Sequence, residues 1–94
     1  MQVEFADRAE IAFNSLPERD RKRVRKTLQK VVEPDAVVPF SQRGLVQLRQ
    51  VTGRPLWVAR VSQTLRMVVS ITEGVITIED IVPRSRLDRI SGRS

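Results

Sequence analysis

The spacing of apolar residues divides the chain into a first part with helical periodicity and a second part with strand periodicity. Val3 and Phe5 flank the polar Glu4, and this alternation predicts a short first strand. Apolar residues then return at intervals of three and four, which places them on one face of a helix. They are Ala9, Ala12, Phe13 and Leu16.

A second helix is predicted directly after the first. The segment Ser15-Leu16-Pro17-Glu18 matches a capping box with an early proline, a pattern that marks a helix start. Pro34 ends this helix, because the residue before a proline is disfavoured in the helical conformation. The buried stripe of the second helix consists of Val24, Leu28, Val31 and Val32.

From Leu45 onward apolar and polar residues alternate, which predicts strands after a connector over residues 35–44. Residues 52–55 are expected to form a turn, and Pro83 to stop the last strand. Residues 84–94 are predicted to be a polar tail, frayed over 91–94. The predicted strands begin at Leu45 and then cover Leu56–Ser62, Leu65–Thr72 and Val75–Val82.

This order of elements predicts an α+β fold. An N-terminal strand is followed by a helical hairpin and then by three or four antiparallel strands, which form one sheet with the helices on one face. The other face of the sheet is expected to be free. The 94 residues fit one domain, which we place at residues 1–90.

Composition argues against several kinds of chemistry. The chain has no cysteine and no histidine, so we expect no disulfide, no thiol chemistry and no zinc site. No other metal and no cofactor is implied. No apolar run approaches about 18 residues and no signal peptide opens the chain, so we expect a cytoplasmic protein without a membrane partner.

The net charge is +6, and most of the 17 basic residues are arginines. Arginine presents a planar fork of donors that matches phosphate or carboxylate, although a GC-rich genome would also favour its codons. The predicted second helix is strongly basic. It is either a solvated face or a contact surface for nucleic acid or an acidic partner. Its basic residues are Arg19, Arg21, Lys22, Arg23, Arg25, Lys26 and Lys30.

The strand region carries a sharper signal, because no acidic residue lies between Asp35 and Glu73. An ordinary sheet face mixes both signs of charge, and a face of one sign is easier to maintain when an anion neutralises it. The basic residues of this region are Arg43, Arg49, Arg54, Arg60 and Arg66. We take Arg49 and Arg54, together with Arg86, as candidates for binding phosphate or RNA.

Turn lengths predict which strand residues face each other. If Ser62-Gln63-Thr64 is a three-residue hairpin loop, Arg60 lies directly opposite Arg66. Like charges in that position repel each other. A two-residue turn at Glu73-Gly74 then places Arg66 opposite Ile81. The two arginines are therefore expected on one sheet face.

Arg84 follows the last predicted strand and falls near the same hairpin, so it should converge with Arg60 and Arg66. Such a cluster suits a phosphate, whose charge needs several fixed donors. Alternatively, the arginines fill an exposed face and Glu79 neutralises one of them. Strict alternation turns Asp80 toward the helices, which a β-bulge or a buried partner from the second helix would resolve.

Three segments in the strand region resemble the RelE/ParE toxin superfamily: PLWVARV at residues 55–61, LRMVV at 65–69 and GVITIEDIVPR at 74–84. The opening strand and the helical hairpin also look like that family. The resemblance implies a toxin of a type II toxin–antitoxin pair, held inactive by a cognate antitoxin. RelE-like members cleave mRNA in the ribosomal A site, whereas ParE-like members inhibit DNA gyrase.

The resemblance also assigns roles to individual residues. Arg60 and Arg66 match the two arginines that flank the hairpin, and Arg84 matches the arginine after the last strand. In RelE-like nucleases these positions bind the scissile phosphate and stabilise its developing charge. The resemblance therefore makes these three arginines the candidate catalytic residues.

The C-terminal segment departs from the family pattern, because Pro83 stands at its histidine position and the chain has no tyrosine. RNA cleavage by the 2′-hydroxyl needs a group that accepts its proton. Three functions stay open: cleavage of mRNA at the ribosome, gyrase inhibition without chemistry, or a non-catalytic module that binds antitoxin and represses transcription with it. The candidate proton acceptors are Glu73, Asp80, Asp88 and, best placed, Glu79.

Overall fold

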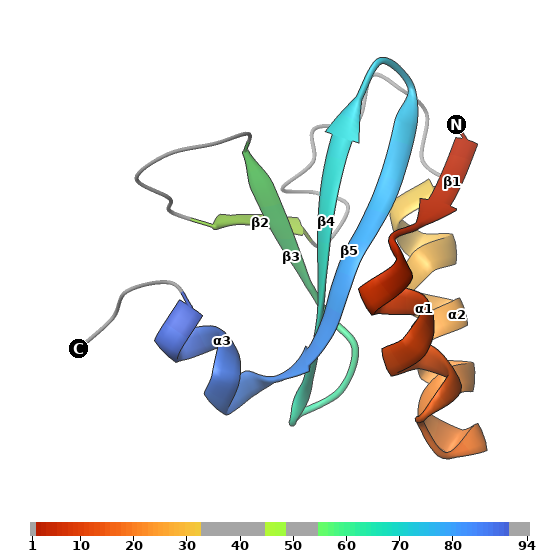
Figure 1. The fold of residues 1–94 in the computed structure, drawn as a ribbon, viewed down its shortest axis with the longest axis vertical. Helices are drawn as coiled ribbons and strands as arrows, with labels where there is room; N and C mark the ends of the chain where they lie inside the picture. Colours follow the sequence, from red (N-terminus) through yellow and green to blue (C-terminus); the bar gives the residue numbers. More distant parts are fainter. Residues whose placement is uncertain (1, 33–44, 49–54, 91–94) are drawn as a thin grey trace.

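The computed structural model describes residues 2–32, 45–48 and 55–90 (Figure 1). The predicted connector at residues 35–44, most of the predicted turn at 52–55 and the tail at 91–94 lie outside these residues. Arg43, Arg49 and Arg54, for which we predicted a role on the sheet face, lie outside them as well. The side chain of Asp88 is also outside the described part.

The described residues form one five-stranded sheet with helices. In chain order the elements are β1 (Gln2–Phe5), α1 (Asp7–Asn14), α2 (Glu18–Val32), β2 (Leu45–Leu48), β3 (Leu56–Arg60), β4 (Leu65–Thr72), β5 (Val75–Pro83) and α3 (Arg84–Ile90). The strand order is β1-β5-β4-β3-β2, in which β1 runs parallel to β5 and the other neighbours are antiparallel. The α+β prediction is confirmed, with four strands after the helical hairpin. The expectation that the second face of the sheet is free was wrong, because α3 lies on that side and contacts β5 and β4 (Figure 1).

One face of the sheet packs against α1 and α2 to form the core (Figure 1). Successive strand side chains point to opposite faces, so alternate residues of each strand reach this core. Burying them away from water is the main force that holds the helices on the sheet. The core joins Ala9, Val24 and Val31 of the helices to Leu45, Ala59, Met67, Val69, Ile76, Ile78 and Ile81 of the strands.

The junction between α1 and α2 differs from the predicted capping box. The Ser15 hydroxyl donates a 2.8 Å hydrogen bond to the carbonyl of Ile11 and so closes α1. The first turn of α2 is built on Pro17, whose carbonyl accepts the amides of Asp20 and Arg21. The capping-box prediction was therefore wrong, because Ser15 bonds backward to the helix that it ends.

Residues Arg84–Ile90 form the helix α3, where the sequence pattern predicted a polar tail. The segment is short and mostly polar, so it carries little apolar periodicity to reveal a helix. Pro83 still belongs to β5, opposite Leu65. In Figure 1, α3 lies on the other side of β5 from α1 and α2, and it contacts β5 and β4. None of the described helices could span a membrane.

A β-bulge interrupts the pairing of β4 with β5. Val69 lies opposite Ile78 but Val68 lies opposite Asp80, so Glu79 is the extra residue. The bulge turns Asp80 away from the core, where strict alternation had placed it. This confirms one of the two predicted solutions, while the ionic partner of Asp80 is Arg8 of α1 and not a residue of α2.

The bulge also corrects the predicted register at the far end of β5. Arg66 lies opposite Val82 and not Ile81. The two-residue turn itself was predicted correctly, since Thr72 pairs with Val75. The shift by one residue arises between the turn and Arg66, at the bulge.

Glu18 should titrate below the usual range of a glutamate. Hydrogen bonds from Arg21 lower the pKa of Glu18 from 4.5, with further attraction from Arg21 and Arg25. A lowered pKa in the folded state stabilises the protein above pH 4.5, and this contribution is lost as the pH falls through the folded value. We expect Arg21→Gln to raise the pKa of Glu18 toward 4.5, measured by NMR titration of the carboxyl carbon. An unchanged pKa in this variant would contradict the assigned cause.

Candidate anion-binding site

Arg60 of β3 and Arg66 of β4 lie directly opposite each other, as predicted from the length of the hairpin loop. Their neighbours Ala59 and Met67 point into the core. Because strand side chains alternate, the two arginines stand on the outer face of the sheet, away from α1 and α2. We call this pair the arginine row.

Hydrogen bonds to the hairpin loop hold the Arg66 guanidinium. Its Nη1 donates to the carbonyls of Ser62 at 2.5 Å, Leu65 at 3.0 Å and Gln63 at 3.5 Å. These carbonyl dipoles disperse the charge of Arg66 and so ease its repulsion from Arg60. Arg66 therefore braces the turn between β3 and β4, a contact that no spacing in the sequence indicates.

Arg84 is the first residue of α3 and is exposed. Its backbone amide donates a 2.8 Å hydrogen bond to the carbonyl of Thr64 in the same hairpin loop. The start of α3 is thus fixed to the loop that Arg66 braces, and all three candidate arginines lie at one end of the sheet. Arg86 is exposed two residues further along α3.

The two carboxylates of the bulge have different surroundings. Glu79 is half-buried and accepts a 2.6 Å hydrogen bond from the hydroxyl of Ser70, which is itself buried. Asp80 accepts the amide of Ile81 at 2.9 Å and forms a 3.8 Å ion pair with Arg8. The geometry thus fixes Glu79 through Ser70 on the outer face of the sheet. Glu73, the third described candidate, lies in the exposed turn between β4 and β5 with a positive φ of 49°.

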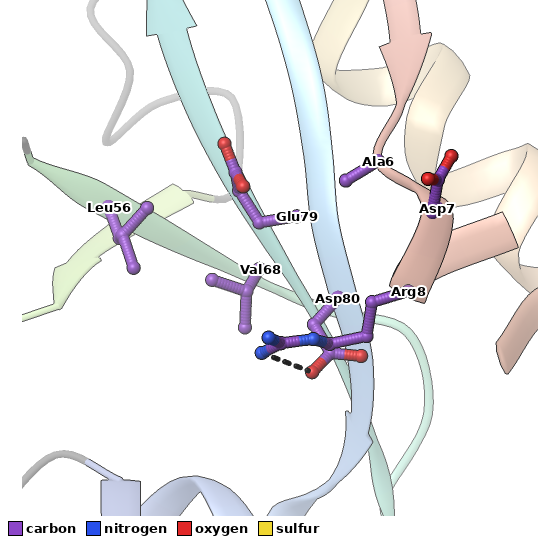
Figure 2. A pocket seen from close by; sticks show the side chains of 7 residues that line it. All are labelled: Ala6, Asp7, Arg8, Leu56, Val68, Glu79 and Asp80. Carbon is purple, nitrogen blue, oxygen red and sulfur yellow. Dashed lines mark ion pairs between the residues drawn. The ribbon is translucent and has the colours of Figure 1, made fainter. Parts of the chain in front are cut away.

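A hollow of about 480 Å3 lies beside these carboxylates, and the sequence did not reveal it. Figure 2 shows Arg8 reaching from α1 toward Asp80, with Leu56 and Val68 on the strands beside it. Arg8 is far from Asp80 in sequence, and the bulge in β5 turns Asp80 toward it. Within the described residues, no group of three or more His, Cys, Asp or Glu side chains is placed to hold a metal ion.

The basic face of α2 is mostly solvated. Arg21 and Arg25 both bond to Glu18, and the Arg25 guanidinium also lies 5.6 Å from the ring centre of Phe13. These internal contacts account for two of the seven basic side chains of α2. The other basic side chains of α2 are exposed: Arg19, Lys22, Arg23, Lys26 and Lys30.

The arginine row should respond asymmetrically to mutation. Arg66→Ala is expected to lower the free energy of unfolding by about 1–2 kcal/mol, because the loop loses charged hydrogen bonds. Arg60→Ala should raise it by a few tenths of a kcal/mol, because it removes the repulsion across the pair. Urea denaturation of both variants measures the difference. Equal effects of the two substitutions would show that Arg66 does not brace the loop.

No protein family model matches this chain, and no curated protein sequence does either. Among solved structures, a chain of the archaeal RelE–RelB complex from Pyrococcus horikoshii OT3 is similar, with a TM-score of 0.66 and 26% identity over 90% of this chain and 96% of that one. YafQ from E. coli strain BL21(DE3) is similar with a TM-score of 0.68 and 11% identity, over 92% of this chain and 96% of that one. Both likenesses extend over nearly the whole of each chain. The chain therefore has the fold of the RelE-like toxin superfamily.

Proposed function

We propose that this chain is the toxin of a type II toxin–antitoxin pair, and that it binds RNA at the ribosome and cleaves mRNA. The observation that carries the proposal is the position of Arg60, Arg66 and Arg84 at one end of the sheet. Fixed cations at one place stabilise the charge that develops on a phosphate during cleavage.

In this proposal the three arginines hold the scissile phosphate. The 2′-oxygen attacks phosphorus, the bond to the 5′-oxygen breaks, and the leaving oxygen takes a proton from water. Glu79 accepts the proton of the 2′-hydroxyl through intervening water, because its hydrogen bond to Ser70 holds it about 13 Å along β4 from Arg66. The chain has no histidine, tyrosine or cysteine for this step. Arg86, together with Arg49 and Arg54 outside the described residues, would bind flanking phosphates.

The proposed regulatory partner is a cognate antitoxin. One of the similar structures is a RelE–RelB complex, and the net charge of +6 suits an acidic partner. Co-expression with the product of an adjacent short acidic reading frame should abolish growth arrest, and the two chains should purify together. If no neighbouring product suppresses the arrest, the antitoxin part of the proposal fails.

Mapping of mRNA 5′ ends after induction tests the cleavage step. We expect that induction stops growth and produces new 5′ ends inside translated codons of ribosome-bound mRNA. An inhibitor that blocks ribosome loading should remove those ends. Growth arrest without ribosome-dependent cuts would contradict the nuclease proposal and leave the toxin assignment standing.

The second candidate function is inhibition of DNA gyrase without chemistry. The absence of histidine and tyrosine from the chain favours it, because both are missing from the segment where the nuclease pattern has them. A supercoiling assay with purified gyrase decides between the two: inhibition at stoichiometric concentrations supports this candidate, and full activity excludes it.

A further inference from the structure

The hollow on the outer face of the sheet has no role in the proposed cleavage step apart from Glu79, which is one of its lining residues. The apolar side chains of Leu56 and Val68 line it together with the polar residues Asp7, Arg8, Glu79 and Asp80 (Figure 2). Binding sites for small organic groups share this plan, an apolar lining with a few polar groups.

We propose that this hollow binds a nucleobase that carries an exocyclic amino group, while the phosphate of the same RNA lies on the arginine row. The inference rests on the proposed RNA-binding function and adds a base preference to it. We refer to the site as the base hollow, formed by Leu56, Val68, Asp80 and Arg8.

The register of the strands places the base hollow next to the arginine row. Val68 follows Arg66 by two residues on β4, so both point to the outer face about 7 Å apart along the strand. The cross-strand row Val46–Val58–Val68–Asp80 therefore runs directly beside Arg60 and Arg66. When a phosphate of RNA is bound by Arg60 and Arg66, the attached sugar and base can reach the apolar residues of this row.

The charges of the base hollow and of the arginine row favour different parts of a ligand. The carboxylates of Glu79 and Asp80 line the hollow with a single guanidinium, while Asp7 lines it with its carboxylate directed away from Asp80 (Figure 2). A second phosphate is disfavoured there, whereas a neutral group with hydrogen-bond donors is favoured. The arginine row in turn repels a basic peptide. A molecule with a phosphate at one end and a neutral, donor-bearing ring at the other satisfies both.

The cross-strand row becomes exposed only away from the hollow, since Val68 is 5% exposed. Val46, at the far end of the cross-strand row, is 70% exposed, whereas most of the other large apolar side chains in the described residues are at least partly covered. A flat base gains free energy by covering such surface. The apolar row and the carboxylates at its β5 end thus point to one ligand of mixed character.

Asp80 is the group that would recognise the amino substituent. Its Oδ1 is fixed by the amide of Ile81, whereas its Oδ2 is only 3.8 Å from Arg8, whose side chain is 79% exposed. Only 17% of the Asp80 side chain is exposed, but the Arg8 end of the pair is solvated and the contact is long. The amino group of adenine, cytosine or guanine can therefore replace Arg8 as the donor to Oδ2. Uracil has no amino group to offer.

Binding of fluorescein-labelled 2′-O-methyl trinucleotides UAU, UCU, UGU and UUU tests the proposal, because the methyl group blocks cleavage. Fluorescence anisotropy should show the first three bound about five-fold more tightly than UUU, the effect of one hydrogen bond. Asp80→Asn retains the acceptor for the Ile81 amide and should bring all four within a factor of about two. Leu56→Ser should weaken all four, whereas Ile11→Ser, an exposed aliphatic residue on α1, should leave them unchanged.

The outcomes separate the base hollow from the proposed function. Arg60→Gln should weaken all four trinucleotides equally; if it has no effect but the base preference persists, the phosphate placement fails and the base hollow stands. Equal binding of the four, no binding at millimolar concentration, or an unchanged preference in Asp80→Asn overturns the base hollow. The base hollow is also overturned if Leu56→Ser and Asp80→Asn lose antitoxin binding but bind the trinucleotides normally. That result would show that the hollow contacts the antitoxin instead of a base.

Discussion

Arg84→Gln is expected to reduce ribosome-dependent mRNA cleavage by about 100- to 1,000-fold. Glutamine keeps much of the length and polarity of arginine but removes the charge that stabilises the scissile phosphate. Arg84 is exposed at the start of α3, so the fold should tolerate the change. The measurement is the rate at which a defined message on purified ribosomes is cut in single turnover.

Arg23→Gln is the matched control, since Arg23 is equally exposed but lies on α2. It should change the rate by less than about two-fold. A double variant with Arg60→Gln should lose less than the product of the two single effects, because both residues act on one phosphate. If Arg84→Gln cleaves at the normal rate, the arginine cluster is not the catalytic site.

Ile78→Ala should cause the largest loss of stability among single substitutions considered for this chain. Ile78 is fully buried, lies opposite Val69 and Phe5, and sits next to the bulge. Truncating a buried isoleucine costs about 2–5 kcal/mol through lost burial and the cavity left behind. A small domain has only about 5–15 kcal/mol in total, so much of its stability would be lost.

Urea denaturation monitored by the fluorescence of Trp57, the single tryptophan, measures this loss. Ile11→Ala is the control, because Ile11 is 68% exposed and its truncation should change the free energy of unfolding by less than about 0.5 kcal/mol. Similar effects of the two substitutions would show that the sheet does not pack on α1 and α2 as described.

The strands and the hairpin register could be predicted from the sequence because both depend on local features. A run rich in apolar and β-branched residues, bounded by the polar loops at residues 62–64 and 73–74, defines β4 to its observed ends, Leu65 and Thr72. A three-residue loop between β3 and β4 leaves little freedom for the strands that it joins, so the pairing of Arg60 with Arg66 follows from counting residues.

The features that sequence reasoning missed depend on contacts between distant segments. The alternation of residues indicates that β5 needs a bulge but not where it lies; its position at Glu79 moves the partner of Arg66 from Ile81 to Val82. The bulge turns Asp80 toward Arg8, and these two residues line the hollow. Helix α3 was missed because a short polar helix has little periodicity to detect.

The parallel pairing of β1 with β5 has a consequence for the order in which the molecule forms during translation. β1 is synthesised first and β5 last among the described strands, yet each needs the other to complete its side of the sheet. Helix α1, which follows β1, also packs against β5. Such non-local contacts are made late and slowly. A nascent chain would thus lack the assembled sheet, and the end of the sheet where the arginines gather, until β5 has been translated.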